Sequence, residues 1–451
     1  ATGNTNANLT TFKVEARRAD NTVDTEYTGT VTLTKNSGPG NIQGTVSFNA
    51  VAGVATFSAV QFDAAGTYTI RAASGSFTNI VSGNIVISTL SAATDFFRSR
   101  SAGPNDWNAA GSWESSPNAA GPWITATRYP DEDASGVEIR AGHTININTS
   151  DIYITNTKVF GVLKVTTSSP FFIEGTTDGI ELEIENGGVL DVSNTGYVSY
   201  ASASFGLVKT GGKIIANPGA DALYFLYDYL DYDDGKFYFA DNAIAEWNLE
   251  SYPPTSNDYD YGIYNDNIIF PYPNNSGAMP IFRISNISSN SSYGYGSTAN
   301  PSTINAKLEL NTTKTFNIHN NNNQKSIYIL GGISGQGTIN QFGTASQPGQ
   351  LILGDATTMP TLGGNINLKM ISSRLKLPNG ANIPSGANVL IERNASTDQN
   401  GIIDKSGGSI NINGVLDISN MRIQNATAGN VSVNGGGTLR TRNTGGLFGT
   451  G

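Results

Sequence analysis

The amino-acid sequence predicts an all-β chain in which a β-sandwich precedes a right-handed parallel β-helix. Short runs that alternate apolar and polar residues fill the first part, and Gly-rich turns followed by short apolar strands recur through the second. No helical periodicity interrupts the alternating runs. Charged residues make up 14% of the 451 residues, against roughly 25% in ordinary soluble domains, and Asn, Ser, Thr and Gly supply the remaining polarity.

Residues 1–88 are predicted to form the sandwich, because each alternating run can bury one face of a strand. Turn residues separate the runs, as at positions 36–40, 52–53 and 82–84, with the even spacing that is typical of a sandwich. The alternating apolar positions are Phe12, Val14, Ala16, Val31, Leu33, Val46, Phe48, Val60, Phe62, Tyr68, Ile70, Ile85 and Ile87.

Tyr68 ends a run from Asp63 that resembles the tyrosine corner of immunoglobulin-like sandwiches, in which a Tyr hydroxyl bonds back to the backbone. Together with residues 27–33 and 53–57, this run resembles the bacterial Ig-like repeats of long surface adhesins over nearly all of residues 9–88. The resemblance implies an Ig-like sandwich that acts as a spacer or stalk, with Asp63 and Tyr68 in structural roles.

Residues 89–106 lose the alternation and are predicted to be a linker. Trp107, Trp113 and Trp123 then arrive within residues 107–157, which also contain an apolar strand pattern at 137–147. The open end of a solenoid exposes the apolar interior of its coil and needs a cover. We therefore expect a buried, Trp-rich N-terminal cap and the first coils here; a ligand platform is the alternative.

Residues 107–147 as a whole are similar to the opening of large β-helical surface proteins of the Bacteroidetes, which commonly leave the cell by type IX secretion. The tryptophans and the run around Arg140 and His143 carry the resemblance, which is looser beyond residue 147. It implies a modular protein that is secreted to the bacterial cell surface.

Residues 158–451 are predicted to be the parallel β-helix. Gly-rich turns precede apolar strands at positions 161–165, 187–192, 211–215, 363–368, 407–412 and 435–439, and residues 188–194 are closely copied at 414–420. In a β-helix Val, Ile and Leu fill the interior while Gly, Asn and Asp occupy the corners, which explains the many Asn residues. Asn-Gly pairs would also suit antiparallel hairpins, the alternative architecture.

A stretch rich in Tyr and Asp at 221–275 interrupts this rhythm and is predicted to be a loop insertion that binds a ligand, because long loops on rigid scaffolds often carry binding sites. Tyr rings can stack on sugars while carboxylates accept sugar hydroxyls, although Tyr also fills structural edges. The candidate binding residues are Tyr227, Tyr229, Tyr232, Asp231, Asp233, Asp234, Tyr259, Tyr261 and Tyr264.

Asp231, Asp233 and Asp234 precede Gly235 with spacing that partly matches a calcium loop. The full EF-hand spacing and its distal Glu are absent, so a solvated acidic turn is the preferred interpretation. We expect no cofactor, with Ca²⁺ as the minor alternative.

Composition excludes several classes of function. The net charge of −10 and the absence of a basic, aromatic-interleaved run argue against nucleic acid, and no apolar run approaches the roughly 20 residues of a membrane span. There are no cysteines for disulfides or thiolate metal sites. A Ser/His/Asp triad or a His-rich metal centre would have to draw on His143 and His319 alone.

No catalytic residues can be assigned. Enzymes with a pectate-lyase-like β-helix place several carboxylates and a basic residue on one face, whereas Lys164, Asp191 and Asp417 fall in distant coils. The sequence therefore favours a non-catalytic, extracellular structural or adhesive segment of a large surface or fibre protein. The alternative is a carbohydrate-active β-helix that binds or cleaves polysaccharide.

The expected partners are glycans or other surface proteins. Residues 1–8 are polar and turn-like where a first strand is expected, and the pattern from 435 begins a coil without a polar capping repeat. These features predict an excerpt of a longer fibre protein that associates end to end.

Overall fold

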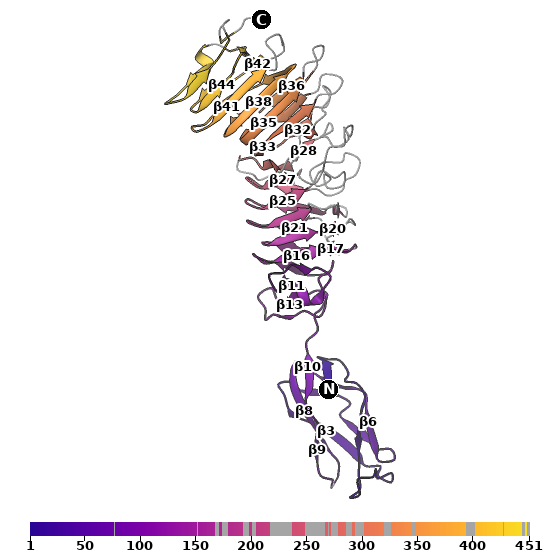
Figure 1. The fold of residues 1–451 in the computed structure, drawn as a ribbon. Helices are drawn as coiled ribbons and strands as arrows, with labels where there is room; N and C mark the ends of the chain where they lie inside the picture. The colour runs from indigo at the N-terminus through magenta and orange to yellow at the C-terminus, as the bar shows by residue number, and fades with distance from the viewer. Residues whose placement is uncertain are drawn as a thin grey trace. The chain divides into compact units, whose positions relative to one another are not determined.

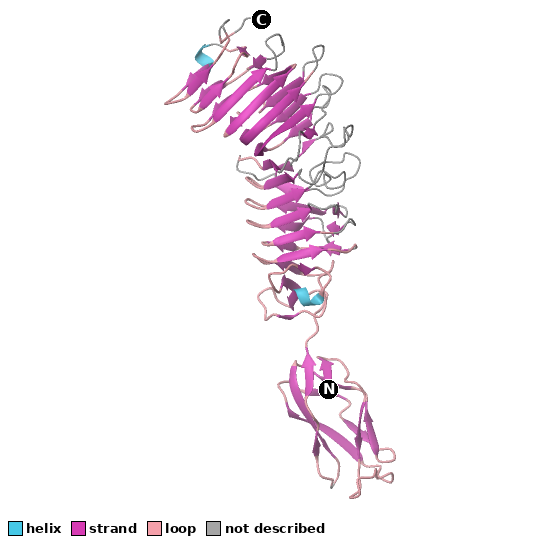
Figure 2. Cartoon of the chain, viewed as in Figure 1, coloured by secondary structure: helices cyan, strands magenta, loops and turns pink. Residues whose placement is uncertain are grey.

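The computed structural model of the protein describes residues 1–75, 77–150, 152–166, 171–173, 179–192, 198–200, 204–216, 237–248, 267–268, 270–271, 278–285, 291–293, 302–319, 326–343, 349–393, 402–426, 428–443 and 447–448. They form two compact units: residues 1–92 with 115–127, and residues 93–114 with 128–451. Strands dominate both (Figures 1 and 2), and the helices of the described residues are two short 3-10 turns, Ala110–Ser112 and Ala428–Asn430. The all-β prediction is confirmed.

Residues 1–92 of the first unit contain one larger sheet and two strand pairs. The larger sheet has the order β1-β10-β8-β3-β5 with β9 beside β8, and the pairs are β2–β6 and β4–β7. The strands of residues 1–92 are β1 (Thr2–Asn4), β2 (Phe12–Glu15), β3 (Thr30–Ser37), β4 (Ile42–Gly44), β5 (Ser47–Asn49), β6 (Val54–Phe57), β7 (Val60–Phe62), β8 (Gly66–Ala73), β9 (Ile80–Val81) and β10 (Ile85–Ser88). Neighbours run antiparallel except β1 and β10.

Alternation along these strands builds the core of the first unit. Val31 and Leu33 are buried while their neighbours in β3 are exposed, as the period of two predicts. Phe62 stacks on Tyr68 with ring centroids 4.0 Å apart. The expectation that residues 1–8 lack a strand is wrong for residues 2–4, because parallel backbone pairing of Thr2 with Val86 forms β1 despite the polar side chains.

The second unit is a parallel β-helix, as predicted. β15 (Gly136–Ile139), β16 (Thr144–Ile147) and β17 (Ile152–Ile154) form three faces of one coil. In the next coil β18 (Thr157–Val159), β19 (Val162–Val165) and β20 (Phe171–Ile173) pair with them one for one, in parallel. The described strand pairs from β15 onward run in parallel, so the antiparallel-hairpin alternative is wrong there.

Further strands repeat this pattern up the solenoid (Figure 1). They are β21 (Gly179–Ile184), β22 (Val189–Val192), β23 (Val198–Tyr200), β24 (Ser204–Val208), β25 (Lys213–Ala216), β26 (Phe237–Phe239), β27 (Ile244–Asn248), β28 (Asn267–Ile268), β29 (Phe270–Pro271), β30 (Ile281–Ser285), β31 (Ser291–Tyr293), β32 (Ser302–Ile304), β33 (Lys307–His319), β34 (Ser326–Ile329), β35 (Gly332–Phe342), β36 (Gly349–Leu353), β37 (Thr361–Leu362), β38 (Asn365–Ile371), β39 (Ser373–Lys376), β40 (Gly380–Ile383), β41 (Asn388–Arg393), β42 (Ile402–Asp404), β43 (Ser409–Ile412), β44 (Val415–Asp417), β45 (Arg422–Gln424), β46 (Val431–Val433) and β47 (Thr438–Arg440).

The solenoid core is built from files of apolar side chains that stack in register from coil to coil. One file comprises Ile145, Leu163, Leu190, Ile214, Ala245, Phe282, Leu308 and Ile333, each at most 1% exposed. Gly380 shows why corners take glycine: its φ is +73°, and a Cβ there would meet Ser409 O at 2.1 Å. Stacked interiors and tight corners together position the outward-facing residues in straight rows.

Strand pairing begins before the tryptophans. Residues 96–99, inside the segment expected to be a linker, form β11 (Phe96–Ser99), and β12 (Asn105–Asp106) follows. β11 pairs with β15 and β12 with β16, so the solenoid extends into this segment. Phe97, 1% exposed, supplies the buried apolar position of β11. β13 (Trp113–Ser116) pairs with β11, and β14 (Ile124–Thr125) pairs with β13.

Candidate functional site

The predicted ligand-binding residues lie outside the described residues. They fall between β25 and β26 and between β27 and β28 in the chain: Tyr227, Tyr229, Tyr232, Asp231, Asp233, Asp234, Tyr259, Tyr261 and Tyr264. Their role and the calcium alternative stay predictions. In the part of the chain that the structure describes, no three His, Asp or Glu side chains gather as a metal site would require, and no helix is long and apolar enough to span a membrane.

Tyr68 and Asp63 fasten the same corner of the first unit. The Tyr68 hydroxyl donates to Ala64 O at 2.7 Å and accepts from the Gly40 N–H at 2.9 Å. The Asp63 carboxylate accepts from the backbone N–H of Asn41 at 2.6 Å and from its side chain at 2.9 Å. These hydrogen bonds hold the pKa of Asp63 below its ordinary value.

Trp107 and Trp113 pack edge to face in the first turns of the solenoid, with ring centroids 5.0 Å apart. They are 1% and 0% exposed. Trp107 Nε1 donates to Pro130 O at 3.1 Å, and Trp113 Nε1 donates to Trp107 O at 2.7 Å. Neither ring is available to a ligand. Trp123 is half-buried and belongs to the other compact unit.

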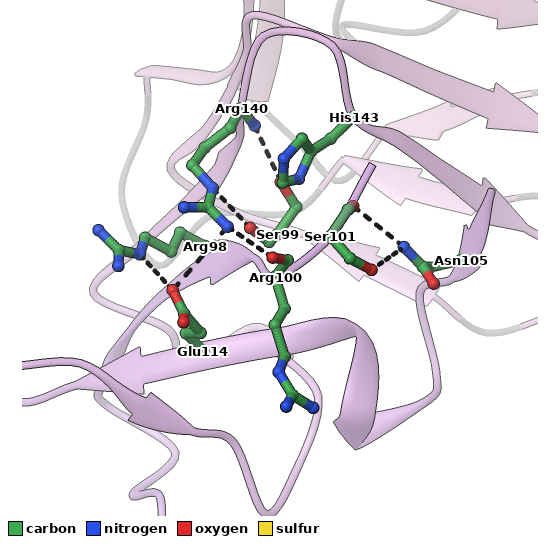
Figure 3. Close-up of polar contacts among 8 residues, drawn as sticks. All are labelled: Arg98, Ser99, Arg100, Ser101, Asn105, Glu114, Arg140 and His143. Carbon is green, nitrogen blue, oxygen red and sulfur yellow. Dashed lines mark hydrogen bonds and ion pairs between the residues drawn. The ribbon is translucent and has the colours of Figure 1, made fainter. Parts of the chain in front are cut away.

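Beside these tryptophans, a polar cluster joins β11 to the loop after β15 (Figure 3). Arg140 donates from Nε to Ser99 O at 2.7 Å and from Nη2 to Arg100 O at 2.8 Å. Glu114 accepts from Arg98 Nε at 2.7 Å and lies 3.9 Å from Arg140 Nη2. Two adjacent coils are therefore tied by charged side chains as well as by strand pairing.

Ser99 and His143 form the one feature of this cluster that resembles catalytic machinery. Ser99 Oγ lies 2.9 Å from His143 Nδ1 and accepts the Arg140 backbone N–H at 3.0 Å. Yet Ser99 is 0% exposed, so no substrate reaches its hydroxyl. Burial, followed by the positive charge of Arg140, holds the pKa of His143 below its ordinary value. The pair fastens the loop in place.

A first row of charged side chains lies on the outward face of the sheet in which β16, β19, β22, β25, β27, β30 and β33 follow one another. Lys164 Nζ donates to Asp191 Oδ2 at 2.9 Å, and the two residues are partners in the register of β19 and β22. The expectation that these two residues fall in distant coils is therefore wrong. Further up, Arg283 lies 3.6 Å from Glu246 and 2.9 Å from Glu309, its register neighbours on either side. Parallel register thus places opposite charges one coil apart.

A second group of charges lies on the neighbouring face. Lys209 Nζ contacts Glu183 at 2.8 Å and Glu185 at 2.7 Å, and Lys158 lies 3.5 Å from Glu183. Burial opposes ionisation of Glu183, but the hydrogen bond and charge of Lys209 outweigh it and hold its pKa below the ordinary value. Burial likewise opposes the charge of Lys209, but both carboxylates outweigh it and raise its pKa.

Further up the sheet that contains β19 and β22, exposed amides form a row of their own, beside the charged register partners Lys369 and Glu392. Gln336, Asn365 and Asn388 are successive register partners in β35, β38 and β41, and all three are exposed. Thr338, Asn367 and Leu390 form the next register row and are half-buried. The two rows line a shallow hollow of about 340 Å³. We call these six residues the amide hollow.

The amide hollow was not predicted from the sequence. Asn residues were expected at corners, whereas Asn365 and Asn388 begin strands whose later residues alternate inward and outward. The signal was an Asn directly before an apolar residue in two successive strands.

Comparisons of this chain with protein-family models, with curated proteins and with solved structures found no match.

Proposed function

We propose that this chain is a non-catalytic, extracellular segment of a large bacterial surface or fibre protein, with a structural and adhesive role. In this proposal the first unit is an Ig-like sandwich that acts as a spacer, and the solenoid is right-handed. The motifs of residues 9–88 and 107–147 support a cell-surface protein of Bacteroidetes type, exported by type IX secretion.

The observation that supports the non-catalytic role is the ion pairing of Lys209 with Glu183 at 2.8 Å and Glu185 at 2.7 Å, which links one coil to the next. A general acid needs a raised carboxyl pKa, and a lysine base needs a lowered one. The pKa of Glu183 is lowered and that of Lys209 is raised, which is the reverse of both requirements, so both groups stay charged at neutral pH. Together with the pairs Lys164–Asp191 and Arg283–Glu309, they link one coil to the next.

A glycan array combined with assays for new reducing and unsaturated ends tests this proposal. We expect binding to polysaccharide without any new chain ends. New ends that accumulate in proportion to the protein concentration would overturn the non-catalytic role.

A polysaccharide-cleaving enzyme is the second candidate, and one observation favours it. Glu183, Glu185, Lys158 and Lys209 gather on one face, which is the kind of grouping that β-helical enzymes use. If this group were catalytic, E183Q combined with E185Q would abolish formation of new chain ends, whereas the same change at Glu309 would not.

A further inference from the structure

We propose that the amide hollow of β35, β38 and β41 binds an extended, neutral polysaccharide that lies along the solenoid axis. The inference rests on the proposed adhesive function and adds to it a site and a class of ligand.

The first step is the register of the three exposed amides. Gln336, Asn365 and Asn388 repeat once per coil, and neighbouring strands of a sheet lie about 4.8 Å apart. A row with this short, regular spacing matches a polymer whose hydroxyl groups also repeat along its length. Its direction is fixed by the stacked interior residues Ile339, Leu368 and Ile391, each at most 1% exposed.

The second step is that these amides are not used by the fold. Within the described chain, no hydrogen bond joins the side chains of Gln336, Asn365 and Asn388 to one another or to other groups. Each amide therefore offers two N–H donors and one acceptor to a ligand. A purely structural amide ladder would instead consume these groups along the axis.

The third step concerns Asn367 in the adjacent row. Its Nδ2 donates to Glu392 Oε1 at 3.1 Å. Its Oδ1 has no hydrogen-bond partner in the described structure. A ligand hydroxyl could satisfy this acceptor after a small side-chain shift, which would make up for a missing hydrogen bond.

The fourth step is the charge of the hollow. Its lining carries amides, the Thr338 hydroxyl and the apolar Leu390, and none of these groups is ionised. Amides and hydroxyls recognise sugar hydroxyls, while Leu390 offers contact to the apolar C–H face of a sugar ring. A polyanion would gain no counter-charge from these six residues, so a neutral chain is favoured.

The test compares two double variants on immobilised neutral polysaccharides: β-glucan, xylan, mannan and starch. Asn365→Ala with Asn388→Ala removes two amides of the hollow. The matched control, Asn382→Ala with Asn411→Ala, removes two register-paired amides from β40 and β43. We expect the full chain to bind at least one of these polymers, the first variant to weaken binding at least about tenfold, and the control to change it less than about twofold.

Salt dependence and the thermal midpoint complete the experiment. Binding should be unchanged at about 1 M NaCl, because a neutral ligand involves no screened charge. Equal thermal midpoints for the two variants would exclude misfolding as the cause. Binding only to alginate, polygalacturonate or heparin, or to none of these polymers, would overturn the inference.

A third variant separates failure of the site from failure of the function. This triple variant replaces Tyr229, Tyr232 and Tyr261 with Ala. If it abolishes polysaccharide binding while the amide variant does not, the adhesive function stands and the site assignment is wrong. If the polymer is cut, the proposed function itself is wrong.

Discussion

At the scale of single residues, buried polar groups fasten the irregular segments that strand pairing does not reach. Glu181, 4% exposed, accepts hydrogen bonds from Thr155 Oγ1 at 3.0 Å and from the Asn156 N–H at 2.9 Å. Asn156 has a φ of +42°, a conformation that few residues other than glycine adopt. A buried carboxylate thus holds a tight corner between β17 and β18, in the same way that Ser99 holds the loop at His143.

His143 should make stability depend on pH. Its pKa in the folded protein lies below the ordinary value of about 6.5, so the unfolded chain binds more protons as the pH falls through this range. The free energy of unfolding should therefore decrease from pH 7 downwards and level off below the folded pKa. Denaturant titrations at several pH values should show this decrease in the wild type but not in H143Q. An identical pH profile in both proteins would contradict it.

Tyr68→Phe should destabilise the first unit by about 1–3 kcal/mol, because Ala64 O and the Gly40 N–H both lose the hydroxyl that they contact. Chemical denaturation with tyrosine fluorescence measures the loss. Tyr129 is 41% exposed, and Tyr129→Phe is the matched control with an expected change below about 0.5 kcal/mol. Equal effects of the two variants would remove Tyr68 from its structural role.

At the scale of elements, the sequence predicts which segments become strands better than it predicts which strands meet. Turn glycines and alternating apolar residues are local signals, and they were enough to predict the parallel β-helix. Register is not local: Thr144 pairs with Val162, but Ile244 pairs with Ile281, so coil length varies. The pairing of Lys164 with Asp191 and the row of Gln336, Asn365 and Asn388 both depend on register, so neither could be foreseen.

The stacked files should dominate the stability of the solenoid. Leu190→Ala removes a fully buried side chain between Leu163 and Ile214, and it should cost about 2–5 kcal/mol of unfolding free energy. Lys158→Ala removes a salt bridge whose lysine side chain is 55% exposed, and should cost less than about 1 kcal/mol. Denaturant unfolding monitored by circular dichroism compares them. A larger loss for Lys158→Ala would reverse the proposed roles of core and surface.

At the scale of the whole molecule, the described solenoid combines an apolar interior, coil-to-coil ion pairs and one uncharged, amide-lined hollow. The ion pairs leave Glu183 and Lys209 charged, which suits a rigid scaffold better than acid–base chemistry. The unused amides suit recognition of hydroxyl groups. These features support the proposal that the chain is a surface segment that binds polysaccharide without cleaving it.

The most direct test of this account is a depletion experiment on insoluble neutral polysaccharide, with bound protein and released sugar measured in the same tube. The account predicts that protein leaves the supernatant as polymer is added, that the Asn365→Ala and Asn388→Ala double variant stays behind, and that no soluble oligosaccharide appears. Release of oligosaccharide in proportion to the amount of bound protein would contradict the account.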